Sequence, residues 1–126
     1  MRIIKVNLTD HTIREEAFHQ EDYGFFGGRG LIARFLTDYC DPLCDALGPD
    51  NPLIFATGYF SGTILTTSNR LSIGAKSPLT GGIKESNSGG TFARRMTDHQ
   101  IKIILFEGSP QTGFISTSIK RGTPAW

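Results

Sequence analysis

The segment from residue 57 to residue 90 carries the side chains and backbone best suited to binding a ligand. It contains seven glycines among many serines and threonines. Glycine lets backbone N–H groups approach a ligand closely and form concave anion sites. Arg70 follows a hydroxyl-rich turn, from which its guanidinium fork would project, and Lys76 and Lys84 are the other cations of this segment. This composition suits a phosphate or another anion.

Asn87 and Gly89 extend this candidate site. Asn87 stands between two serines and just before Gly89 and Gly90. Its side chain offers a carbonyl oxygen to a hard cation such as Mg²⁺, or an amide to a phosphate. The residues alone leave two interpretations open, an anion site or the β-turns of an antiparallel sheet with Arg70 as a solvated charge. No Walker motif occurs, and residues 27–30 lack the strand–GxGxxG–helix frame of a dinucleotide site.

Cys40 and Cys44 lie four residues apart, which would place them on one face of a helix. A zinc site or an iron–sulfur cluster needs more ligands than this pair, and the three histidines show no matching spacing. We expect two free thiols in a helix and its exit turn.

Hydrophobic periodicity predicts the elements that would position these residues. Residues 31–39 have the apolar spacing of a helix, and this is the one clear helix. A shorter helix is expected to open at 88–90 and to run through 96. Strands are expected over residues 3–8, 12–17, 53–58, 71–76, 101–107 and 114–119, of which 101–107 is the strongest. The fold class is α+β, a β-rich, mainly antiparallel sheet with one main helix.

The composition fits a single globular domain. The chain has 126 residues, 38% of them hydrophobic, which is enough for one modest core. A net charge of +1 argues against nucleic acid as a partner. No apolar run approaches the roughly 20 residues that span a bilayer, and residues 1–8 alternate like a strand rather than forming the apolar core of a signal peptide. We expect no nucleic acid, no membrane and a cytoplasmic location.

Seven short segments follow one another along the chain and are considered together: 27–31, 47–58, 61–63, 67–70, 75–81, 86–90 and 106–108. In order and spacing, from about residue 4 to residue 117, this series resembles the opening of the tungsten-containing aldehyde:ferredoxin oxidoreductases. The resemblance predicts an incomplete N-terminal tungstopterin-binding-like domain over residues 1–119. Residues 120–126 are expected to be a tail without family resemblance.

This resemblance implies a β-sheet base beneath a tungsten bis-pterin cofactor, whose phosphates are bridged by magnesium. The family's arginine between pterin and [4Fe-4S] cluster falls on Arg70. Its asparagine near the magnesium falls on Asn87, and its glycine backbone contact falls on Gly89. The implied reaction oxidises an aldehyde to a carboxylic acid and passes electrons to ferredoxin. Because the cluster cysteines and acid/base residues of the family lie in later domains, no catalytic residue is carried over. Whether this chain is an enzyme is left open.

Four functions are compatible with the sequence. The chain is a subunit that docks with a larger subunit carrying the helical domains and the cluster, or the inactive product of a truncated gene. Alternatively, it is a stand-alone module for pterin or nucleotide phosphate, or a self-associating structural protein. Because a sheet without covering domains exposes apolar surface and strand edges, we expect a homo-oligomer or a larger partner subunit. The sequence specifies neither the aldehyde nor tungsten against molybdenum.

Overall fold

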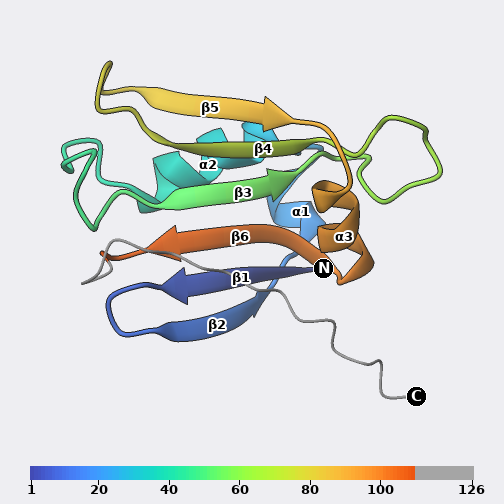
Figure 1. Cartoon of the computed structure of the whole chain (residues 1–126), viewed down its shortest axis with the longest axis horizontal. Coiled ribbons are helices and arrows are strands. Elements are labelled where there is room, and N and C mark those ends of the chain that lie inside the picture. Colours follow the sequence, from blue (N-terminus) through green and yellow to red (C-terminus); the bar gives the residue numbers. More distant parts are fainter. Residues whose placement is uncertain (110–126) are drawn as a thin grey trace.

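A single six-stranded sheet organises residues 1–109, the part of the chain that the computed structural model describes (Figure 1). The strand order is β2-β1-β6-β3-β4-β5. The strands are β1 (Arg2–Asn7), β2 (Thr12–Ala17), β3 (Leu53–Thr57), β4 (Leu71–Lys76), β5 (Ile83–Ser88) and β6 (Ile101–Glu107). Neighbouring strands in this part of the chain are antiparallel except for β1 and β6, which are parallel. The expected α+β class with a mainly antiparallel sheet is confirmed. The strand expected at 114–119 and the tail from 120 lie outside the described residues.

Three helices accompany the sheet in residues 1–109: α1 (Gln20–Tyr23), α2 (Arg29–Tyr39) and α3 (Phe92–Asp98). The main helix, α2, begins two residues before its expected start. The helix expected to open at 88–90 begins only at Phe92, because Ser88 still belongs to β5. The hydrophobic pattern does not predict β5, which has only one apolar residue and runs along the edge of the sheet. Backbone pairing with the more apolar β4 holds β5 in the sheet, because its own side chains are mostly exposed.

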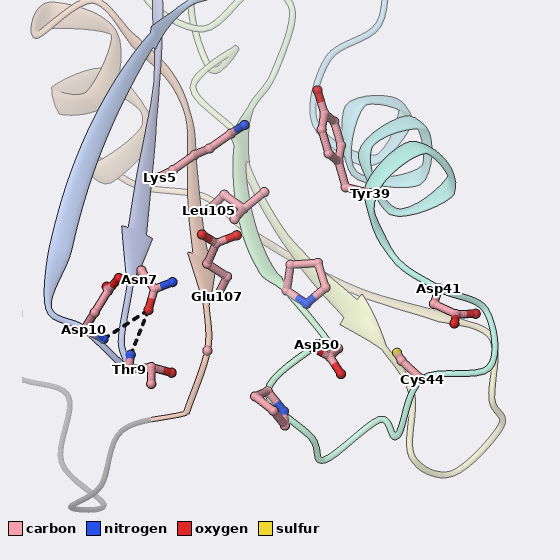
Figure 2. A pocket seen from close by; sticks show the side chains of 13 residues that line it. Lys5, Asn7, Thr9, Asp10, Tyr39, Asp41, Cys44, Asp50, Leu105 and Glu107 are labelled. Carbon is pink, nitrogen blue, oxygen red and sulfur yellow. Dashed lines mark hydrogen bonds between the residues drawn. The ribbon is translucent and has the colours of Figure 1, made fainter.

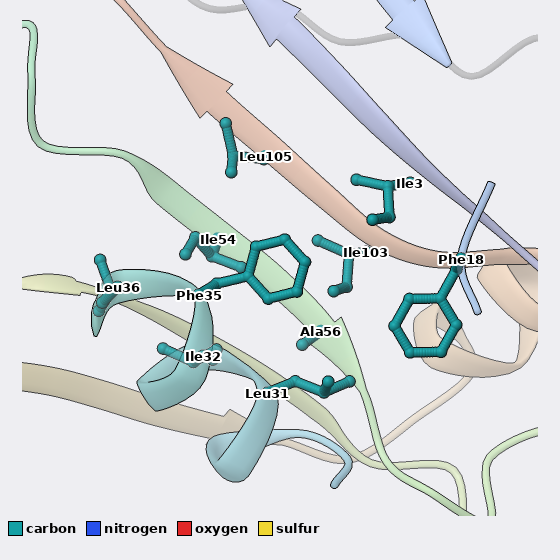
Figure 3. Close-up of a cluster of buried hydrophobic side chains, with 10 residues drawn as sticks. All are labelled: Ile3, Phe18, Leu31, Ile32, Phe35, Leu36, Ile54, Ala56, Ile103 and Leu105. Atoms are coloured by element: carbon teal, nitrogen blue, oxygen red, sulfur yellow. The ribbon is translucent and has the colours of Figure 1, made fainter. Parts of the chain in front are cut away.

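The main core lies between α2 and one face of the sheet (Figure 3). Four α2 side chains at helical spacing, Leu31, Ile32, Phe35 and Leu36, are buried against alternate residues of β3 and β6. Their partners on the sheet side are Ile3, Ile54, Ala56, Ile103 and Leu105, with Phe18 at the margin. At Gly74 the helix comes so near that an added Cβ would lie 2.5 Å from Ile32 Cγ2. This contact fixes the N-terminal end of α2 over β4 and β5.

The opposite face of the sheet carries a second, less completely covered core. Ala93 and Met96 of α3 pack there against Leu71 and Ile104. Half-buried apolar side chains continue this surface beyond the helix: Ile4, Val6, Phe55, Ile73, Ile101 and Phe106. In the described residues, no helix combines the length and the apolar character needed to cross a membrane.

Candidate functional site

Arg70, Asn87 and Gly89 lie together at one end of the sheet. Arg70 directly precedes β4, and Asn87 lies on β5 opposite Ser72. The Nε of Arg70 donates a hydrogen bond of 2.8 Å to Oδ1 of Asn87. A Cβ added at Gly89 would lie 3.3 Å from Nη1 of Arg70, so its backbone also adjoins the guanidinium. The two side chains therefore share one face, although their role towards a cofactor stays a prediction.

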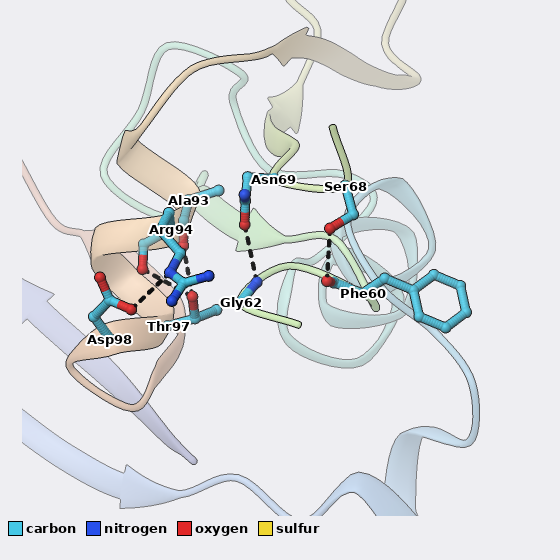
Figure 4. Close-up of polar contacts among 8 residues, drawn as sticks. All are labelled: Phe60, Gly62, Ser68, Asn69, Ala93, Arg94, Thr97 and Asp98. Carbon is cyan, nitrogen blue, oxygen red and sulfur yellow. Dashed lines mark hydrogen bonds and ion pairs between the residues drawn. The ribbon is translucent and has the colours of Figure 1, made fainter. Parts of the chain in front are cut away.

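The loop between β3 and β4, whose internal contacts are drawn in Figure 4, holds the backbone of Arg70 in place. The Arg70 carbonyl accepts hydrogen bonds from the Gly58 amide at 2.9 Å and from Ser61 Oγ at 3.3 Å. Within the loop, the Gly62 amide donates to Asn69 Oδ1 at 2.9 Å, and Ser68 Oγ donates to the Phe60 carbonyl at 2.9 Å. The loop is thus closed by its own polar side chains, which explains the density of Ser, Thr and Asn before Arg70.

Asn87 is oriented by a hydrogen-bonded chain that reaches α2. Its Nδ2 donates to Ser72 Oγ at 3.0 Å. The Glu85 carboxylate, 8% exposed, pairs with Arg29 of α2 at 3.0 Å. A hydrogen bond from the Ser72 hydroxyl, with further ones from Asn87 and Arg29, lowers the pKa of Glu85 below its ordinary value. Glu85 is therefore a charged anchor that joins the β4–β5 hairpin to the start of α2.

A hollow of about 470 Å³ opens over this network. Its lining consists of Phe25, Gly27, Gly28, Arg29, Gly58, Tyr59, Arg70, Ser72 and Asn87. A Cβ at Gly27 would lie 2.2 Å from the Tyr59 amide nitrogen, and Gly28 has a φ of +51°. Both positions therefore require glycine, and the backbone forms the floor of the hollow where side chains would fill it.

The charge in this hollow is positive. Arg29 is neutralised by Glu85, whereas among the ion pairs of residues 1–109 none involves Arg70. The rings of Phe25 and Tyr59 lie edge to face, with centroids 5.8 Å apart. An unpaired guanidinium, an amide and aromatic walls suit a flat ligand that carries phosphate.

A buried lysine lies beneath the same loop. Lys102 of β6 is 2% exposed, and its Nζ donates to the Gly58 carbonyl at 3.0 Å and lies 5.9 Å from the centroid of the Tyr59 ring. Burial lowers the pKa of Lys102 to about 8. Sequence reasoning missed Lys102, which shares its face of β6 with Ile104 and Phe106, because a single lysine in an apolar strand is usually exposed. It also missed the pairing of Arg29 with Glu85, 56 residues apart, because this depends on the register of β4 and β5.

A larger hollow of about 780 Å³ lies at the opposite end of α2 (Figure 2). Four acidic residues, Asp10, Asp41, Asp50 and Glu107, line it together with Lys5. In the described part of the chain, no three His, Cys, Asp or Glu side chains are arranged to hold a metal ion. This hollow therefore has neither the charge for an anion nor a formed cation site.

Comparison with known proteins places the chain in a family. Residues 3–120 match the family model described as the N-terminal domain of aldehyde ferredoxin oxidoreductase. The chain belongs to the aldehyde ferredoxin oxidoreductase family. It is 44% identical over 108 residues to the tungsten-containing aldehyde ferredoxin oxidoreductase of Pyrococcus abyssi and 38% identical over 111 residues to that of Pyrococcus furiosus. These matches cover 85% and 87% of the chain but 18% of each relative.

The family fold is also found in a solved structure. The active site complex BamBC of benzoyl coenzyme A reductase superposes with a TM-score of 0.82 and 32% identity, covering 87% of this chain and 17% of that one. The family membership predicted from the seven segments is thus confirmed, as is the fold. The roles of Arg70, Asn87 and Gly89 in this family domain stay predictions.

Proposed function

We propose that the chain is the cofactor-binding part of a tungsten–pterin, iron–sulfur aldehyde oxidoreductase. The observation that carries this proposal is the junction of Arg70, Asn87 and the Gly89 backbone beside a glycine-floored hollow in a domain of this family. The relatives named above are tungsten-containing enzymes, which favours tungsten over molybdenum. The residues present fit a pterin that carries phosphate: an unpaired guanidinium, a side-chain amide, aromatic walls and backbone where a Cβ would clash.

In this proposal each residue has a definite task. When bound, the tungsten–pterin group supplies oxygen transfer and electron relay. Arg70 donates charge-assisted hydrogen bonds to the anionic ligand, on the side that would face a cluster. The Glu85–Arg29 pair and Ser72 fix the orientation of Asn87, and Lys102 adds positive charge beneath the loop.

The contact of Asn87 with Arg70 limits how Asn87 can bind magnesium. Its Oδ1 already accepts a hydrogen bond from Arg70 at 2.8 Å. A divalent cation on the same oxygen would meet the guanidinium charge at close range, which is unfavourable. We therefore propose that the main task of Asn87 is to hold Arg70 in place. A magnesium ion at the phosphate end of the ligand would contact Asn87 only after the hydrogen bond between Arg70 and Asn87 has rearranged.

The complete reaction needs more than this domain. The proposed oxidation of an aldehyde to a carboxylic acid requires a [4Fe-4S] cluster, acid/base residues and a docking site for ferredoxin, all expected in helical domains of the same polypeptide or of a partner subunit. We propose a cytoplasmic location for this assembly. The alternatives are a stand-alone phosphate module, a self-associating structural protein, an inactive product, or reduction of an aromatic acyl-CoA, as the name of the BamBC neighbour suggests.

Purification from the native host tests the proposal. The expected preparation contains tungsten and iron by elemental analysis, pterin after oxidation, and the helical domains by mass spectrometry, and it reduces ferredoxin when an aldehyde is added. Pterin without the helical domains would favour the stand-alone module. Activity with benzoyl-CoA and none with aldehydes would favour the acyl-CoA reaction. A preparation free of pterin and tungsten would overturn the proposal.

A further inference from the structure

The two cysteines of the chain meet at the C-terminal end of α2. Cys40 caps the helix, Cys44 lies in the following turn, and their sulfur atoms are 3.4 Å apart. Both are half-buried, and the chain contains no other cysteine. A disulfide joins two sulfurs at about 2.05 Å, so this pair must close by about 1.4 Å to form one.

The fold itself sets this short distance. The Cys44 amide donates to the Asp41 carbonyl at 2.9 Å, which closes the turn between the two cysteines. The Nζ of Lys76 in β4 donates to the carbonyls of Pro42 and Cys44 at 2.6 Å each. The bond within the turn and the two bonds from Lys76 thus hold the turn against β4, with the two sulfur atoms next to each other.

The two sulfurs differ in their access to a reagent. Cys44 lines the hollow of about 780 Å³ (Figure 2), whereas Cys40 lines a smaller one of about 230 Å³ on the other side of the turn. Burial, together with the hydrogen bond to Cys44, raises the pKa of Cys40 to about 11. Cys40 is therefore a protonated thiol at neutral pH, and Cys44 is the sulfur that meets a reagent first.

We propose that Cys40 and Cys44 form a reversible disulfide, which fastens the end of α2 to the loop that walls the larger hollow. The oxidant is a small disulfide of the glutathione class. Cys44 loses its proton to water and attacks one of its sulfurs, and the first small thiolate leaves and takes up a proton. Cys40 then gives up its proton and attacks Cys44 Sγ, and the second small thiolate leaves and takes up a proton. Two protein thiols are oxidised, and one small disulfide is reduced to two thiols.

Trapping in glutathione redox buffers tests this proposal on the whole chain. Oxidised buffer should give a protein that has lost two hydrogens, takes up no maleimide and carries no glutathione. Reduced buffer should restore two maleimide-reactive thiols. The oxidised form should also have a higher urea midpoint, because the link restricts the unfolded chain; the shift is modest for a ring of only five residues.

The Cys40→Ser variant is the matched control. It keeps Cys44, which lines the larger hollow, but has no second thiol, so it should retain one glutathione on Cys44 under conditions in which the wild type retains none. This contrast identifies Cys40 as the resolving thiol. Wild-type protein that keeps glutathione, links to a second copy through a disulfide, or remains a dithiol in oxidised buffer would overturn the proposal.

Discussion

At the scale of single residues, the site depends on which charges have partners. Arg29 and Glu85 neutralise each other at 3.0 Å, so they serve as a clamp between α2 and the hairpin. The Arg70 guanidinium contacts an uncharged amide instead, which holds the group in position and leaves its charge for a ligand. A carboxylate in the place of Asn87 would have oriented Arg70 equally well, but it would have cancelled the charge that an anion needs.

Lys102 gives a prediction for the pH dependence of stability. An unfolded lysine keeps its proton up to about pH 10.5, whereas the buried Lys102 loses it at about 8. Between these pH values the unfolded state binds more protons, so the contribution of Lys102 makes the free energy of unfolding rise with pH. Replacing Lys102 with Met should remove this rise, which amounts to about 1–3 kcal/mol over the interval.

Urea unfolding of the wild type and Lys102→Met at pH 7, 8, 9 and 10 measures this effect. The raised pKa of Cys40 acts in the opposite direction above pH 9, because the unfolded thiol ionises first. That contribution is common to both proteins, so the difference between them isolates Lys102. If the difference in unfolding free energy between the two proteins stays constant from pH 7 to 10, burial does not lower the pKa of Lys102 as described.

At the scale of elements, the close packing of α2 on β4 positions the site. The approach at Gly74 leaves no room for a side chain, since an added Cβ would also lie 2.9 Å from the Lys84 carbonyl oxygen. Because that carbonyl belongs to the neighbouring strand β5, relief of the clash requires the helix or the hairpin to move. Arg29 sits at the start of this helix and Asn87 on this hairpin, so their relation depends on the same contact.

Gly74→Ala should therefore destabilise the domain by roughly 1–3 kcal/mol, as expected for an overpacked core. Gly82→Ala is the control, because its nearest contact would be Thr80 Oγ1 at 3.7 Å and the turn there leaves space. The control should change the unfolding free energy by about 0.5 kcal/mol or less. Equal urea midpoints for the two variants would show that α2 does not pack on β4 as described.

The elements also show what could be predicted from the sequence. The bounds of β4 follow from its apolar alternation, those of β6 from its largely apolar run, and α2 follows from its helical spacing. The strand β5 could not be predicted in this way, because backbone pairing with β4, rather than burial of its polar side chains, holds it in the sheet. The approach of Arg70 to Asn87 depends on that strand, so the sequence could name both residues as candidates for one site but could not predict the contact between them.

At the scale of the whole molecule, the sheet is covered unequally. The α2 face buries a continuous core, whereas the α3 face leaves several large apolar side chains half-exposed beside two sheet edges, β2 and β5. The chain spans about 18% of the length of its tungsten-containing relatives. Apolar surface of this kind usually marks a contact with further protein.

We expect the isolated chain to self-associate through this α3 face, over roughly the 1,600 Å² of a standard interface. Replacing Phe55 with Lys, which puts a charge among half-buried apolar groups, should shift the chain towards monomer. Leu43→Lys, at an exposed position in the turn after α2, is the control, because α2 covers the other face of the sheet, and it should leave the association unchanged. Light scattering across a concentration series checks this, and a strictly monomeric wild type at high concentration would count against it.

The central claim is that the Arg70–Asn87 face holds the tungsten–pterin group, and tungsten retention tests it most directly. The wild type, Arg70→Ala, Asn87→Ala and Arg94→Ala are produced in the native host and dialysed, and tungsten per chain is measured. Arg94 is the control because it pairs with Asp98 on α3. We predict about tenfold to a hundredfold weaker retention without Arg70, a several-fold loss without Asn87 and none without Arg94. Equal retention by Arg70→Ala and Arg94→Ala would contradict the account.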